Sequence, residues 1–141
     1  MFVEIFTICD AATDYGGRLN ILGAFEGIAA PVAPVQKERC SLAVRMRFDA
    51  SESGEHKIEV NITDEDGNAI GPTMSARVRV KILDGRASGA QNLVLNISGM
   101  RFPRFGTYDI RLSVDGESRS SLPLLVAQTQ KRNRMRGTME N

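Results

Sequence analysis

Apolar and polar side chains alternate with a period of two along most of this 141-residue chain. The alternation is clearest over residues 42–48, 58–62, 74–82 and 108–114. A period of two places successive side chains on opposite faces of a pleated strand, so each strand has one dry face and one wet face. Because strands of parallel sheets are buried on both faces and lose this alternation, the pattern predicts an all-β protein built from antiparallel sheets.

Turn-forming residues divide the chain into about eight predicted strands. These strands are expected at residues 2–11, 19–26, 40–48, 56–63, 73–82, 92–98, 107–114 and 117–126. The pairs Gly16-Gly17 and Asp115-Gly116 are typical of tight hairpins, since such turns need positive φ angles. Residues 29–35 contain two prolines and are predicted to be a loop that crosses between sheets. We therefore expect an antiparallel β-sandwich of about 7–8 strands over residues 1–126.

The sequence Phe105-Gly106-Thr107-Tyr108 places a tyrosine just inside the penultimate predicted strand. Immunoglobulin-like folds carry a tyrosine corner at this place, in which the hydroxyl bonds to nearby backbone. The Asp-Gly hairpin and a final apolar strand follow it. This arrangement favours an immunoglobulin-like sandwich with Greek-key connections.

The formal net charge of +1 is unevenly distributed along the chain. Residues 127–141 carry a charge of +3, which leaves −2 for residues 1–126. The charges of this segment are Lys131, Arg132, Arg134 and Arg136 against Glu140. Because the apolar rhythm also stops there, we expect a basic, flexible C-terminal tail at 127–141. The body does not have the basic charge of a nucleic-acid binder.

The sequence also predicts a compartment. Residues 1–10 contain no basic residue and Glu4 interrupts their apolar run, so no secretory signal is expected. No apolar stretch approaches the roughly 20 residues that span a bilayer. We therefore expect a cytoplasmic protein with no membrane partner. Cys9 and Cys40 are in phase with inward-facing neighbours, so buried thiols are expected, with a disulfide between them as the alternative.

Residues with catalytic or metal-binding chemistry are few. His56 is the single histidine, and a nucleophilic site would have to combine it with Cys9 or Cys40, neither of which lies in a setting that lowers a thiol pKa. One histidine and two distant cysteines do not supply a zinc site. The acidic run Asp64-Glu65-Asp66-Gly67-Asn68 lacks the spacing of an EF-hand loop, so a solvated turn is favoured and a calcium site of another geometry stays open. We predict no catalytic residue, no cofactor and no enzymatic activity.

Five basic residues form a candidate anion-binding set. They alternate with apolar residues on two predicted strands, and the set is Arg45, Arg47, Arg77, Arg79 and Lys81. If those strands share a sheet, the set forms a cationic stripe that could hold phosphates or an acidic polysaccharide. The alternative is a solvated face balanced by Glu59. No aromatic side chains interleave with the arginines, so there is no stacking platform for single-stranded nucleic acid.

The first predicted hairpin is apolar on both faces, unlike the rest of the chain. Phe6 and Ile8 lie on one side of their strand, opposite Val3, Ile5 and Thr7. Leu22 and Ala24 likewise face away from the apolar residues beside them on the second strand. The second face must be covered either by the 29–35 loop or by another subunit. Phe6, Ile8, Leu22 and Ala24 are therefore the candidate interface.

Several short stretches resemble a family of small, uncharacterised bacterial single-domain β proteins. They lie at residues 3–10, 14–19, 23–25, 40–42, 54–56, 64–67, 92–96 and 106–108, so the resemblance covers nearly the whole chain up to Val126. The basic tail lies outside it. The resemblance implies a bacterial β protein and supplies no catalytic residues.

Three functions follow as hypotheses from these observations. The leading one is a non-enzymatic protein-interaction or structural module that associates with itself, as a homo-oligomer, or with a protein partner through the first hairpin. The alternative is an anion-binding protein that uses the arginine set and the tail on nucleic acid or an acidic polysaccharide. The third is a hydrolase centred on His56 and nearby carboxylates.

Overall fold

The predicted alternation produces strands along nearly the whole of the computed structural model, which describes residues 1–130. All eight expected strands are present, and a short ninth strand directly precedes Pro31. The strands are β1 (Phe2–Tyr15), β2 (Arg18–Ala24), β3 (Gly27–Ala30), β4 (Val35–Asp49), β5 (Gly54–Thr63), β6 (Met74–Val80), β7 (Ser88–Phe102), β8 (Gly106–Val114) and β9 (Glu117–Gln128). A 3-10 turn, Ala50–Glu52, follows β4. The prediction of an all-β protein is confirmed.

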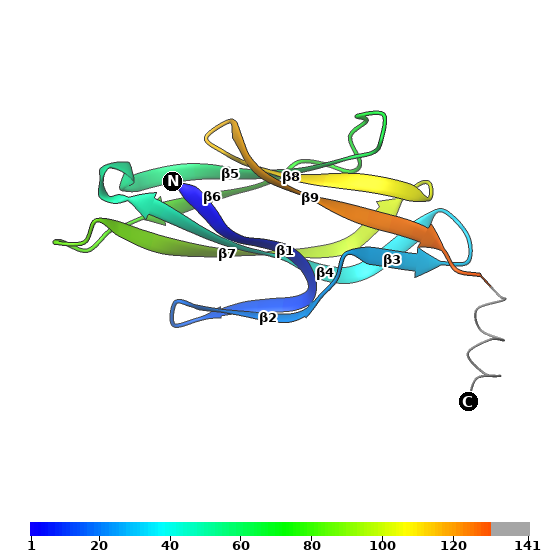
Figure 1. The fold of residues 1–141 in the computed structure, drawn as a ribbon, viewed down its shortest axis with the longest axis horizontal. Helices are drawn as coiled ribbons and strands as arrows, with labels where there is room; N and C mark the ends of the chain where they lie inside the picture. Colours follow the sequence, from blue (N-terminus) through cyan, green and yellow to red (C-terminus); the bar gives the residue numbers. More distant parts are fainter. Residues whose placement is uncertain (131–141) are drawn as a thin grey trace.

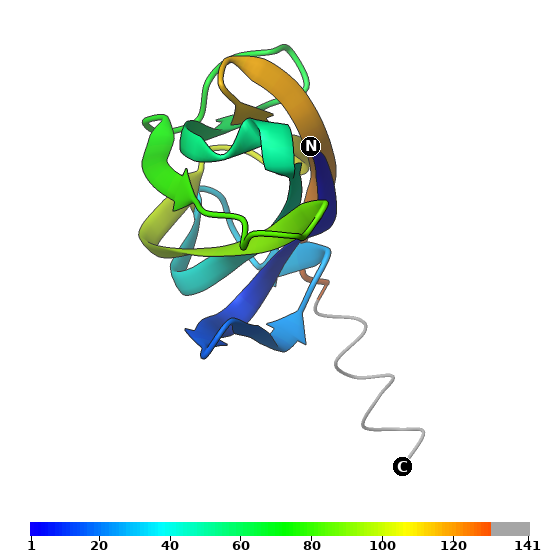
Figure 2. The same ribbon diagram turned by 90° about the vertical axis from the view of Figure 1, so that its left-hand side faces the viewer.

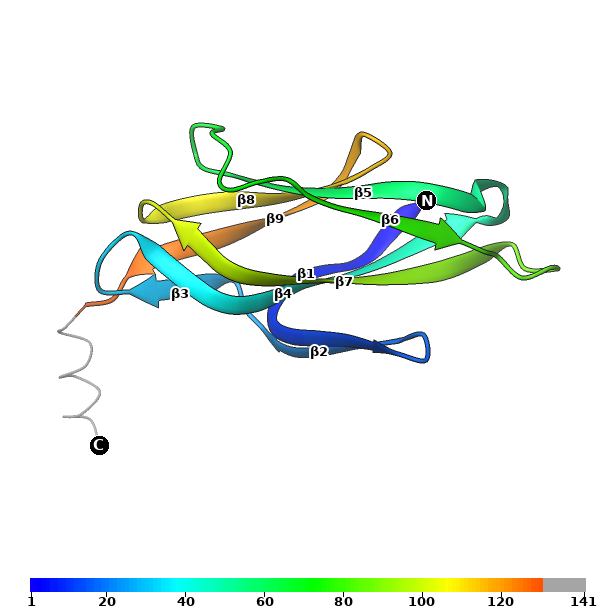
Figure 3. The same cartoon turned by 180° about the vertical axis from the view of Figure 1, so that it is seen from behind.

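The strands form two sheets that pack face to face (Figures 1 and 3). The first sheet has the order β2-β1-β4-β7 and the second has the order β3-β9-β8-β5-β6. Neighbouring strands are antiparallel with one exception, since β3 pairs with β9 in parallel. Strand β7 is the terminal strand of the first sheet and β6 is the terminal strand of the second. The unpaired edges of these two strands lie on the same side of the molecule, which we call its open side.

The core lies between the two sheets and follows the period of two. On β4, Leu42, Val44 and Met46 are fully buried, and on β8 so are Ile110 and Leu112. Each of these residues is separated from the next by a side chain on the other face of its sheet. The alternation in the sequence therefore marks the core correctly on the central strands of both sheets.

The proline-containing connection is shorter than predicted. Ala29 and Ala30 belong to β3, where the amide of Thr129 donates to the carbonyl of Ala30 over 2.9 Å. Residues 31–34 then join β3 in one sheet to β4 in the other, as expected of a crossing loop. The prediction was wrong for the alanines because β9 supplies a pairing partner from the far end of the chain, which local sequence does not reveal.

The second half of β1 pairs with β2, and this hairpin bends over the outer face of the first sheet, to which both strands belong (Figure 2). Its turn is fixed there by Asn92 of β7, whose side-chain amide donates to the carbonyl of Gly17 over 3.0 Å. Beneath the hairpin, Cys9, Ser41 and Ala43 are buried although they lie on the side of the sheet that faces away from the main core. The hairpin thus covers part of its own chain.

The predicted backbone bond of the tyrosine corner is present. The Tyr108 hydroxyl donates to the carbonyl of Arg104 over 2.7 Å and accepts from the amide of the same residue over 3.2 Å. The ring packs edge-on against Phe102, with ring centroids 4.8 Å apart. One side chain therefore ties the connection between β7 and β8 to the core.

We expect Tyr108→Phe to lower the free energy of unfolding by about 2 kcal/mol, because both backbone partners lose their bond to the hydroxyl. Tyr15→Phe is the matched control. Tyr15 is 79% exposed, so removal of its hydroxyl should lower the free energy of unfolding by less than about 0.5 kcal/mol. Urea unfolding of the two variants measures both values. Equal effects would show that the corner bond contributes nothing to stability.

The C-terminal boundary also differs slightly from the prediction. β9 continues to Gln128, two residues beyond the expected end of the domain at Val126. The rest of the predicted tail, residues 131–141 with its basic side chains, lies outside the described residues. Among residues 1–130, no helix has the length and apolar character needed to cross a membrane.

Candidate interaction surface

Two of the four predicted interface residues lie in the core of the chain itself. Ile8 is fully buried opposite Leu42, and Phe6 lies opposite Val44 and packs against the core. A register shift in β1 near Glu4 changes which side chains face inward along this strand. Phe6 and Ile8 were therefore wrongly assigned to an interface, because the other sheet of the same chain covers them.

The other two predicted interface residues, Leu22 and Ala24, are exposed. Leu22 is 70% exposed, and β-pairing places it on the same hairpin face as the exposed Tyr15. Beside Leu22 lies a shallow, almost entirely apolar groove of about 330 Å³ that includes Ala11 and Ile21. The hairpin thus exposes Leu22 and Tyr15 on a face that they share with the polar Thr13, Arg18 and Asn20.

The candidate anion-binding set is divided between the two sheets. Arg45 and Arg47 lie on β4, and both bind the carboxylate of Glu4, with Nε–O distances of 2.9 and 2.8 Å. These contacts lower the pKa of Glu4, and the hydrogen bond from Arg47 has the largest effect. Arg77 and Arg79 belong to β6 in the other sheet, and Lys81 follows that strand. The condition for a single cationic stripe is therefore not met, because its strands do not share a sheet.

His56 has a structural environment that uses both ring nitrogens. Nδ1 lies 2.6 Å from a carboxylate oxygen of Asp115, and Nε2 lies 2.6 Å from the backbone carbonyl of Glu52. The ring also packs against Phe48, with centroids 4.6 Å apart. The hydrogen bond to the Glu52 carbonyl, the hydrogen bond to Asp115 and the negative charges of the Asp115 and Glu52 carboxylates raise the pKa of His56 against the opposing effect of burial. Since both partners only accept hydrogen bonds, the arrangement suits the imidazolium, in which both ring nitrogens donate.

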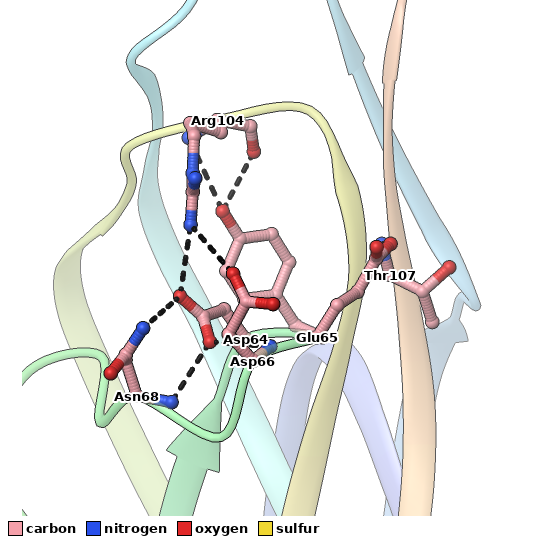
Figure 4. A network of polar contacts seen from close by, with 7 residues as sticks. Asp64, Glu65, Asp66, Asn68, Arg104 and Thr107 are labelled. Carbon is pink, nitrogen blue, oxygen red and sulfur yellow. Dashed lines mark hydrogen bonds and ion pairs between the residues drawn. The ribbon is translucent and has the colours of Figure 1, made fainter.

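The acidic loop predicted as a solvated turn is tied to the tyrosine corner (Figure 4). Asp64 accepts hydrogen bonds from the amides of Asp66 and Asn68 at 3.0 and 2.9 Å, and from the guanidinium of Arg104 at 3.1 Å. These hydrogen bonds lower the pKa of Asp64, and the bond from the backbone amide of Asn68 has the largest effect. The adjacent Glu65 accepts the Thr107 amide at 2.8 Å.

The loop's contacts show no metal arrangement. Within the part of the chain that the structure describes, no group of three or more histidine, cysteine, aspartate or glutamate side chains is placed to hold a metal ion. The carboxylates of the loop point instead toward Arg104 and backbone amides (Figure 4). The loop is thus a turn, as favoured, but it is docked on the 103–108 connection rather than free in solvent.

Both cysteines are free, buried thiols. Cys40 belongs to the main core, whereas Cys9 lies under the hairpin and donates to the carbonyl of Ser41. Burial raises the pKa of each thiol, so neither is an activated nucleophile. The expectation of buried thiols is confirmed.

An apolar groove lies where the open edges of the two sheets meet. It has a volume of about 490 Å³, and its lining runs from the β5–β6 connection to the end of β7. Apolar contributors include Ile70, Met74 and Ile97. Such a size and lining are typical of ligand or peptide sites.

Further apolar side chains lie on β6, on β7 and on the segments that follow β5 and β6, and these two terminal strands are seen together in Figure 3. They are packed against the core but only partly buried, and they are Ile70, Met74, Ile82, Leu93, Leu95 and Ile97. We call these six residues the seam. The seam is not visible in the sequence alone, because alternation marks inward-facing residues but does not indicate which of them a facing strand covers.

Comparisons with known proteins identify a family and a fold. A family model that describes a family of unknown function matches residues 4–127. No curated protein matches the chain. Among solved structures, the alkylpurine DNA glycosylase AlkC of Pseudomonas fluorescens is similar with a TM-score of 0.52 and 12% identity, over 89% of this chain and 30% of that one.

A β-glucosidase from Listeria innocua is similar with a TM-score of 0.50 and 8% identity, over 89% of this chain and 16% of the enzyme. The chain thus spans less than a third of the length of either protein. At these identities the likeness shows a shared fold and nothing about activity.

Proposed function

The chain belongs to this family of unknown function, DUF6941, and we propose that it is a non-enzymatic protein-interaction module that binds a partner along the seam. The observation that carries the proposal is the apolar groove of about 490 Å³ between the edges of β6 and β7. Half-buried apolar side chains beside such a groove gain burial when a partner covers them. Two further observations support a non-enzymatic role. Both ring nitrogens of His56 are hydrogen-bonded within the chain, and the raised pKa values of Cys9 and Cys40 make these thiols poor nucleophiles.

We expect Ile97→Glu to weaken partner binding at least about tenfold, because a carboxylate in an apolar contact loses its hydration without gaining a partner. The test is affinity capture from the native lysate, with quantification of the bound protein by mass spectrometry. Leu125→Glu is the matched control, since Leu125 is 51% exposed on β9, away from the seam. Thermal melts verify that both variants are folded.

The proposal requires a stoichiometric partner that the wild type and Leu125→Glu retain and Ile97→Glu loses. Met74→Lys, at the other wall of the groove, should lose the same partner. Retention by both seam variants would remove the seam as the binding surface.

The exposed hairpin face supports self-association as a second candidate. Leu22 and Tyr15 are 70% and 79% exposed on the same face, and an apolar groove of about 330 Å³ lies beside Leu22, so a second copy would gain burial there. We expect Leu22→Asp to shift a wild-type dimer toward monomer in sedimentation velocity runs. A wild-type protein that stays monomeric at every concentration tested would exclude this use of the hairpin.

The proposal also includes an immunoglobulin-like arrangement of the strands and a cytoplasmic location in a bacterium. The tyrosine-corner bonds of Tyr108 support an immunoglobulin-like sandwich. Action in the cytoplasm of a bacterium is what the two free thiols and the sequence resemblance favour.

A further inference from the structure

Strand β7 presents an edge that lacks the usual protection against pairing. It is a terminal strand of its sheet, and from Ser88 to Met100 it contains no charged residue. The facing terminal strand, β6, carries Arg77 and Arg79 over only seven residues. Proteins normally blunt long edge strands with charge, proline or shortness, because the free N–H and C=O groups otherwise pair with another chain. The contrast marks β7 as an edge kept open for pairing.

The inner face of β7 is also incompletely covered. Leu93, Leu95 and Ile97 pair with Val44, Leu42 and Cys40 of β4, which are buried, yet the β7 residues themselves are only partly buried. An extended peptide that pairs with the edge of β7 would add a strand to the first sheet. Every second side chain of that peptide would point into the groove and cover the apolar residues of β7. Backbone pairing and apolar burial would therefore occur together.

The chain around this edge is strongly basic. Residues 73–102 contain five basic residues and one acidic residue, a charge of +4, whereas the remaining described residues carry −6. Arg77 lies 3.9 Å from Glu55. Within residues 1–130, no ion pair involves Arg79, Lys81, Arg86 or Arg101. These charges are available to attract an acidic partner.

We propose that the partner of the seam is an extended acidic segment, with apolar residues at alternate positions, that adds as a strand to the free edge of β7. The proposal rests on the proposed function and names the chemistry of its partner. A second copy docked through the same edge would bring two surfaces of +4 together, and the basic segment 131–141 carries the same sign of charge. Charge complementarity therefore favours a different, acidic protein.

The test is selection of displayed random peptides of about twelve residues against the full chain, followed by affinity measurements on the enriched peptides as synthetic probes. We expect enriched peptides that alternate apolar and acidic residues. N-methylation of every second backbone amide should weaken binding about 30-fold or more, because the ladder hydrogen bonds are lost. The double substitution of Arg79→Glu with Lys81→Glu should weaken it about tenfold, and added salt should act in the same direction.

Arg119→Glu is the charge-matched control, because Arg119 lies on β9 and pairs with Glu117. It should change the affinity less than about twofold. Enrichment of basic or non-alternating peptides, the absence of any enrichment, or full binding by the N-methylated peptide would each overturn the strand-addition proposal. Those outcomes leave the proposed function intact if Ile97→Glu still loses the captured partner, so the two failures are distinguishable.

Discussion

Phe102→Ala should destabilise the protein by about 4 kcal/mol, a large share of the roughly 5–15 kcal/mol that a domain of this size possesses. Phe102 is fully buried at the end of β7, opposite Val35 of β4, and its ring packs on Tyr108. Truncation leaves a cavity and removes the aromatic partner of the tyrosine corner. The two effects act on the same connection, because Tyr108 holds the backbone of Arg104 two residues further along.

Urea unfolding measures this effect, with Phe2→Ala as the control for loss of the same side chain. Phe2 is 57% exposed at the start of β1, so its removal should cost less than about 1 kcal/mol. Similar losses in the two variants would contradict the placement of Phe102 at the centre of the core.

The second large effect is a dependence of stability on pH that originates at His56. Its pKa in the folded protein is raised above the ordinary value of 6.5, chiefly by the carbonyl of Glu52 and further by the carboxylate of Asp115. A group with a raised folded pKa contributes its full stability below the unfolded pKa, and loses it as pH rises through the folded pKa. The folded protein should therefore weaken as pH increases above about 6.5.

The acid limb has the opposite sign. Hydrogen bonds from His56 and from the amide of Lys57 lower the pKa of Asp115 below its ordinary value of 3.8. Its contribution is thus present above that value and disappears as pH falls through the lower folded pKa. The His56–Asp115 pair consequently favours stability most between about pH 4 and 6.5.

We expect His56→Gln to lose about 2 kcal/mol at about pH 5.5, because the bonds of the imidazolium to Glu52 and Asp115 are removed. The same variant should show little change in stability between about pH 5.5 and pH 8, whereas the wild type declines over this range. Free energies of unfolding from urea titrations at both pH values provide the comparison. A variant with the wild-type slope would place the titrating group elsewhere.

Local features were predicted correctly from the sequence, whereas features that depend on distant strands were not, and the reasons are physical. Tyr108 was found from a local motif, because the corner bond spans only four residues. Ile8 was misassigned because one register shift in β1 reverses which face is inward, and nothing in the strand's own sequence marks the shift. The arginine set depended on two strands sharing a sheet, which sequence spacing does not determine.

The sequence by itself determined the fold class, the positions of the strands and most of the core, because alternation and turn chemistry are local properties. The tertiary structure decided how the strands are ordered, and therefore what covers each apolar face. The hairpin lies over its own sheet, while the inner residues of β7 are left half-buried at an open edge. Exposure depends on neighbours that are distant in sequence, so the surface we propose for interaction emerged only when the two sheets were placed together.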